Sequence, residues 1–132
     1  NFVMEDALSF DGNTGPYVQY TYARTCSVLG KAGNIRDDLP LCVTAEEETA
    51  LLRVIARFEE TVRAAIDAYE PSLITRYILD VAGAYNRFYH NCSILNAEDE
   101  KVKATRLALT AATRTVLGNA FDLICLRRTE KI

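Results

Sequence analysis

The chain lacks any apolar run that approaches the roughly 20 residues a helix needs to cross a bilayer, which argues against a membrane-embedded protein. Its first residues, 1–6, show no basic stretch followed by an apolar stretch, so no secretory signal is predicted there. They have instead the pattern of the end of an amphipathic segment. We therefore expect the chain to be the C-terminal piece of a longer protein.

Cysteine and histidine are few and scattered. The 4 cysteines, at positions 26, 42, 92 and 125, form no Cys-x-x-Cys pair, which argues against a zinc site and a secreted disulfide scaffold. The only histidine, His90, is two residues from Cys92, and on a helix that spacing points the side chains about 160° apart. We expect reduced thiols in a cytoplasmic protein, with neither a metal site nor a thiol catalyst.

What is present is the composition of one globular domain. The 132 residues are 49% apolar and 25% charged, enough for a single sizeable core. The net charge of −3 combines a first part, 1–70, with 6 basic and 12 acidic side chains and a second part, 71–132, with 9 basic and 6 acidic ones. An acidic total does not favour indiscriminate binding to DNA, but the basic part can meet phosphate groups.

Apolar residues recur with helical spacing, and no stretch alternates with period two for long enough to predict a strand. A helix is predicted over 15–32, with Pro16 in its first turn and Gly33 after its end. After a loop over 34–43, Thr44 and Glu47 predict a capping box for a helix over 45–57. The chain then bends near Phe58 and continues as a helix to position 69.

Two further helices complete the pattern. One begins at Pro71, carries an i, i+4 pair of Arg76 and Asp80, and has apolar residues in steps of three and four. The last helix follows the acidic turn 96–100 and is loosened at Gly118-Asn119. Its predicted buried face consists of Leu109, Ala112, Val116, Ala120 and Leu123. The expected fold is all-α, an antiparallel bundle of about five helices over 15–132, with 1–14 as a linking segment.

Residues 6–24 combine a turn, an aromatic run and the pair Ala23-Arg24 in the order Asp-Ala-Leu-Ser-Phe-Asp-Gly-Asn-Thr-Gly-Pro-Tyr-Val-Gln-Tyr-Thr-Tyr-Ala-Arg. This stretch resembles the segment that opens the C-terminal part of arginyl-tRNA synthetases. The anticodon-binding domain of that family is also similar to four later segments, namely 77–95, 104–109, 116–123 and 128–132. The family often ends in Arg-Met, where this chain has Lys131 and Ile132.

The resemblance implies a DALR-type anticodon-binding domain that positions tRNA(Arg) for ATP-dependent aminoacylation by an arginine–tRNA ligase. Both catalytic signatures of class I synthetases are absent from the 132 residues, so no catalytic residue is expected here. ATP and Mg²⁺ would serve the catalytic domain of the same chain, and no cofactor is expected in this part. The expected partners are tRNA(Arg) and that catalytic domain, in the cytoplasm.

The motif Asn86-Arg87-Phe88-Tyr89 supplies the first candidates for tRNA contact. Unpaired RNA bases stack on aromatic or guanidinium planes, and Tyr89 is the candidate for stacking. Because Tyr89 also falls on the apolar stripe, a core aromatic is the alternative. Asn86 and Arg87 lie off the stripe, and His90 lies at its edge. All three are candidates for base edges or phosphate, against ordinary surface positions.

Further cations suit phosphate contacts, which hold RNA in register without reading its sequence. These candidates are Arg106 and Arg114 in the last helix, and Arg127, Arg128 and Lys131, with Ile132 as apolar surface, near the end of the chain. A second group is expected to contact the catalytic domain or the tRNA stem, and comprises Tyr17, Gln19, Tyr20 and Arg24.

A helical module that binds a protein partner and no RNA is the alternative function. The acidic first part of the chain would suit such a partner.

Overall fold

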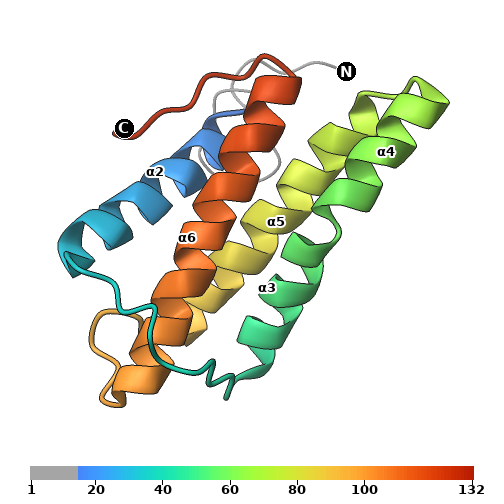
Figure 1. Cartoon of the computed structure of the whole chain (residues 1–132). Coiled ribbons are helices and arrows are strands. Elements are labelled where there is room, and N and C mark those ends of the chain that lie inside the picture. Colours follow the sequence, from blue (N-terminus) through green and yellow to red (C-terminus); the bar gives the residue numbers. More distant parts are fainter. Residues whose placement is uncertain (1–14) are drawn as a thin grey trace.

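The computed structural model describes residues 15–132, and five helices make up most of this part (Figure 1). They are α2 (Gly15–Ala32), α3 (Glu46–Ala56), α4 (Phe58–Ala68), α5 (Ser72–Asn91) and α6 (Glu100–Leu123). These residues form no strand, which confirms the predicted all-α class. The linking segment predicted over 1–14 lies outside the described residues. No helix from position 15 onward combines the length and apolar character of a membrane span.

Helix α5 lies at the centre of the bundle and packs against α2, α3, α4 and α6. Figure 1 shows α3 and α4 following one another along one side of α5, with α6 in front of α5 between α2 and α3. Since only a short turn joins α4 to α5, α5 returns alongside the two helices that precede it. This is the antiparallel arrangement that short connections favour.

The buried side chains form two apolar clusters along α5. The cluster near the start of α5 contains Val18 and Tyr22 of α2, Ile78 and Val81 of α5, and Leu117 and Phe121 of α6. The cluster near its end contains Val28 and Leu29 of α2, Leu51 of α3, Tyr85 and Phe88 of α5, and Leu107 of α6. Each large apolar side chain that is fully buried contributes about 1.5–3 kcal/mol relative to exposure. The apolar stripe predicted for α5 is therefore its core face.

A buried ion pair joins α3 to α6. Glu48 is completely buried, and its Oε1 accepts a 3.0 Å hydrogen bond from Nε of Arg106, whose side chain is 13% exposed. Nη1 of Arg106 also donates to the carbonyl oxygen of Ser93 at 2.6 Å, which ties in the turn after α5. The same carboxylate accepts from the backbone N–H of Thr44 at 3.4 Å and from its hydroxyl at 3.3 Å. Glu48 thus closes the start of α3.

The capping box predicted from Thr44 and Glu47 is wrong by one residue. The N-cap of α3 is Ala45, which makes no side-chain capping bond, and Glu48 is the residue that reaches back to Thr44.

The ends predicted for α2 from Pro16 and Gly33 are confirmed. Pro71 was predicted to begin α5 but is its N-cap, one residue before Ser72. Gly33 has φ of +69°, a left-handed conformation that glycine adopts without strain.

Three other expectations for side chains are corrected. Asp80 pairs at 3.7 Å with Arg57, which lies between α3 and α4, where Arg76 was predicted. Leu123, the last residue of α6, was predicted to be buried and is 50% exposed. Gly118 does not loosen α6, which continues unbroken to Leu123. It gives room to the guanidinium of Arg128 instead.

Replacing Arg106 with methionine should lower the free energy of unfolding by about 3 kcal/mol, because the carboxylate of Glu48 would stay buried without its cation. Urea denaturation followed by circular dichroism measures this change. The matched control is Arg114→Met on the same helix, where the arginine is exposed and an effect within about 0.5 kcal/mol is expected. A loss below 1 kcal/mol for Arg106→Met would contradict this account of the ion pair.

Candidate nucleic-acid interface

A groove of about 740 Å³ lies between α2, the end of α5 with the turn that follows it, and the last residues of the chain. Its cationic side chains are Arg24, Lys31 and Lys131, and Glu130 is the only carboxylate among the described residues that line it. The remaining lining residues are Tyr20, Ala23, Ser27, Val28, Tyr89, His90, Cys92, Ser93, Ile94, Leu95, Asn96 and Ile132. Three segments far apart in the sequence, 20–31, 89–96 and 130–132, therefore meet in one concave surface.

Arg24 stands at the centre of an aromatic cluster in this groove. Its guanidinium lies 4.3 Å from the centroid of the Tyr89 ring and 4.9 Å from that of Tyr20, and its Nη2 donates to the Tyr20 hydroxyl at 3.2 Å. Such cation–π contacts fix the orientation of ring and cation without neutralising the charge. No carboxylate from position 15 onward forms an ion pair with Arg24. The groove thus keeps a positive charge beside two aromatic planes.

Tyr89 combines the two alternatives that its position on the apolar stripe left open. Its ring is 37% exposed, and it packs against buried Tyr85 with centroids 6.3 Å apart and edge-on against His90 at 5.5 Å. It therefore stands at the border between core and groove. Burial raises the pKa of Tyr85 beneath it to about 12.

Asn86 bridges α5 to α2. Its Oδ1 accepts a 2.7 Å bond from Nη1 of Arg24, and its Nδ2 donates to the hydroxyls of Tyr17 at 3.0 Å and Thr21 at 2.9 Å. The prediction that Asn86 faces RNA edges did not foresee these bonds, which connect residues more than 60 positions apart in the chain. No local pattern could have identified them. Through Asn86, the end of α5 holds Arg24 in place.

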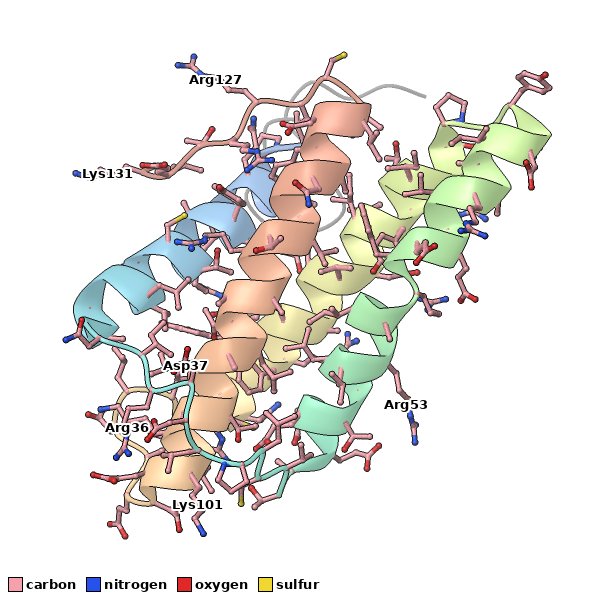
Figure 2. The ribbon with its side chains drawn as sticks, viewed as in Figure 1. Arg36, Asp37, Arg53, Lys101, Arg127 and Lys131 are labelled. Carbon is pink, nitrogen blue, oxygen red and sulfur yellow. The ribbon has the colours of Figure 1, made fainter. Side chains whose placement is uncertain are left out.

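The segment 124–132, which follows α6, runs along α2 and brings Lys131 and Ile132 to the groove. Gln19 donates from Nε2 to the carbonyl oxygen of Arg127 at 3.0 Å. Figure 2 shows the side chains of Arg127 and Lys131 extending outward from this segment. Arg128 is turned the other way, toward Asp122, and its guanidinium holds the pKa of that carboxyl below its usual range.

Several predicted contacts lie outside the groove. Arg106 forms an ion pair with Glu48, which argues against the predicted phosphate contact. Moving its guanidinium to a phosphate would leave the buried Glu48 carboxylate without a cation. Arg114 is exposed on α6, and Arg87 is exposed on α5. The groove gathers six of the predicted residues, Tyr20, Arg24, Tyr89, His90, Lys131 and Ile132. It also includes Lys31, in the last turn of α2, which the sequence reasoning missed.

His90 and Cys92 both line the groove, and the helical spacing assumed for the pair does not apply, because α5 ends at Asn91. Cys92 is the C-cap of α5 and has extended backbone, with φ of −120° and ψ of 125°. Burial raises the pKa of its thiol, and the thiolate that a nucleophile needs is therefore disfavoured. The described residues hold no group of three His, Cys, Asp or Glu side chains that could bind a metal ion.

The bundle and its groove define a class of protein, a small helical binding domain with cations and aromatic rings on one concave face. The chain belongs to the DALR anticodon binding domain family, which it matches over residues 18–132.

The similarity extends to named proteins. The chain is 42% identical over 132 residues to the arginine–tRNA ligase of Clostridium botulinum strain Alaska E43, and this covers 99% of the chain. The solved arginyl-tRNA synthetase of Thermus thermophilus superposes with a TM-score of 0.92 at 33% identity over 99% of the chain. That of Plasmodium falciparum gives 0.85 at 25% identity. In each comparison the chain spans 23% of the relative's length.

Replacing Asn86 with alanine should destabilise the domain by about 1–2 kcal/mol, because the hydroxyl of Tyr17 and the guanidinium of Arg24 lose a partly buried partner. Urea denaturation gives the value. Asn91→Ala in the last turn of the same helix is the control, since that exposed amide reaches only a backbone carbonyl of its own helix. Equal effects of the two substitutions would show that the bridge to α2 is unimportant.

Proposed function

We propose that this chain is the anticodon-recognition domain of an arginine–tRNA ligase and that its groove receives the anticodon loop of tRNA(Arg). The juxtaposition of Arg24, Tyr20 and Tyr89 carries the proposal, because it places beside two aromatic rings a cation that pairs with no carboxylate of residues 15–132. Membership of an anticodon-binding family and the similarity to arginine–tRNA ligases support it.

The groove suits an unpaired RNA loop in three respects. Aromatic and guanidinium planes are the surfaces on which splayed bases stack. Lys31 and Lys131 add exposed positive charge to the lining of the groove, where they can contact phosphate groups. Ser93 and Asn96, in the turn after α5, add polar side chains to the lining of the groove. Tyr89 and Arg24 would stack bases, and the lysines would hold the backbone.

Catalysis belongs to the part of the polypeptide that these 132 residues do not include. There, ATP and Mg²⁺ would support formation of the arginyl adenylate, and the domain described here would present the tRNA. Tyr17, Gln19 and exposed residues of α2 remain candidates for contact with that catalytic part or the tRNA stem. Arg87, Arg114 and Arg127 remain candidates for phosphate contacts beyond the groove. We place the enzyme in the cytoplasm, where translation requires it.

The chain should bind tRNA(Arg) with an affinity that depends on the anticodon and on salt. If Arg24, Lys31 and Lys131 displace counterions, the slope of log K against log salt should be about −2 for a single-stranded loop. Fluorescence titrations with tRNA(Arg) and with the same tRNA altered in the anticodon, each at several salt concentrations, measure both properties. Equal binding of the two tRNAs would contradict anticodon recognition. Absence of binding to either at low salt would favour a protein-binding module.

In the full-length ligase, Tyr89→Ala should raise the KM for tRNA roughly 5- to 100-fold, since stacking of one base contributes about 1–3 kcal/mol. Steady-state charging assays provide the KM. The control is Tyr69→Asn, which removes a ring that is 91% exposed outside the groove. Tyr69 has φ of 54°, and asparagine tolerates this left-handed backbone. An unchanged KM for a folded Tyr89→Ala enzyme would remove Tyr89 from the site.

A further inference from the structure

The segment 124–132 has few attachments to the bundle although it forms one wall of the groove. Leu126 donates its backbone N–H to the carbonyl of Phe121 at 2.8 Å. Within residues 15–132, no backbone–backbone hydrogen bond holds the residues that follow Leu126. The path of Lys131 and Ile132 must therefore depend on side-chain contacts, and the contacts of Arg128 and the Gln19–Arg127 bond are those nearest to them.

Arg128 is seated on α6 in a space that only glycine leaves open. A Cβ atom at position 118 would lie 2.7 Å from both Cζ and Nη1 of the Arg128 guanidinium, closer than atoms in contact approach. Gly118 is itself buried, and it lies within the continuous helix α6, five residues before its last residue, Leu123. Glycine lowers helix stability relative to alanine, so helix formation does not explain its presence here. The space that the Arg128 guanidinium occupies does explain it.

Polar groups on both sides fix the guanidinium over this glycine. Arg128 donates from Nε to Oδ1 of Asp122 at 3.2 Å and from Nη2 to Oδ2 at 2.7 Å, a two-bond arrangement that sets the direction of the planar group. Nη2 also donates to Oδ1 of Asn119 at 3.2 Å. The pair is exposed, with side-chain exposures of 40% and 61%, so it adds little to global stability. Its consequence is geometric.

We propose that Arg128 is a positioning residue, whose seat over Gly118 sets the path of the segment 124–132 and so holds Lys131 and Ile132 at the groove. This rests on the proposed function of the groove as a tRNA site. Arg128 itself would not touch the RNA, because Asp122 neutralises its charge and α6 holds its guanidinium. The phosphate contact predicted for Arg128 from the sequence is thereby replaced by an indirect role.

Gly118→Ala in the full-length enzyme separates this role from stability. The new methyl group displaces the flexible end of Arg128, whereas alanine favours the helix, so the melting temperature should stay equal or rise. The order parameter of the Ile132 δ1 methyl group, measured by NMR on the free enzyme, should fall. The KM for tRNA should rise roughly 3- to 10-fold, because two side chains must be ordered again on binding, with kcat unchanged.

Gly30→Ala is the matched control, since this glycine lies within α2 and a Cβ there meets nothing within 4 Å. It should change neither KM nor the Ile132 order parameter. Arg128→Ala should reproduce the effect of Gly118→Ala, and the double variant should be no worse than either, because both act through one guanidinium. Additive increases in KM would overturn the proposal.

The proposal is also overturned if Ile132 keeps its order in Gly118→Ala, or loses it while KM stays constant. If the proposed function is wrong, a different experimental result is expected. The wild-type enzyme would then charge tRNA(Arg) with the same KM whatever its anticodon. In that case the methyl measurement still reports whether Arg128 orders the segment.

Discussion

The packing of α5 against four other helices is the constraint on which the rest of the structure depends. This packing fixes the rotation of α5 about its axis, with Tyr85 and Phe88 pointing into the core. This rotation in turn brings Asn86 against α2 and leaves Tyr89 and His90 at the groove. Turning α5 about its axis to bury Tyr89 fully would move Tyr85 and Phe88, both completely buried, out of the core. Part of the Tyr89 ring therefore stays exposed at the groove.

Three arginines show how partners decide what the same side chain can do. Arg106 faces a buried carboxylate and cannot leave it, so it joins α3, α6 and the turn after α5. Arg128 faces an exposed carboxylate, which directs it while neutralising it. Arg24 is held by an amide and two rings, all uncharged, and its positive charge remains available to an anion. Position relative to carboxylates, more than exposure, distinguishes the candidate RNA contact from the structural cations.

Much of the fold could be predicted because its signals are local. Pro16 and Gly33 bound the first helix, and the steps of three and four in α5 identify its core face. The errors concern interaction partners. In one case a residue close along the chain was predicted and the structure uses a distant one, and in the other the structure uses the next residue. Asp80 pairs with Arg57 and not with Arg76, and Glu48 replaces Glu47 at the start of α3, because packing selects the residue that faces the right helix.

The sequence by itself determined the helices and their order, since proline, glycine and apolar periodicity act within a few turns. Its motifs also determined the resemblance to the family. Only the tertiary structure decided which predicted residues share a surface. The bonds of Asn86 to Arg24 and of Gln19 to Arg127 join residues 62 and 108 positions apart. The seat of Arg128 depends on where the chain passes over Gly118. Such contacts follow from how helices stack in three dimensions, and no pattern along the chain encodes the stacking directly.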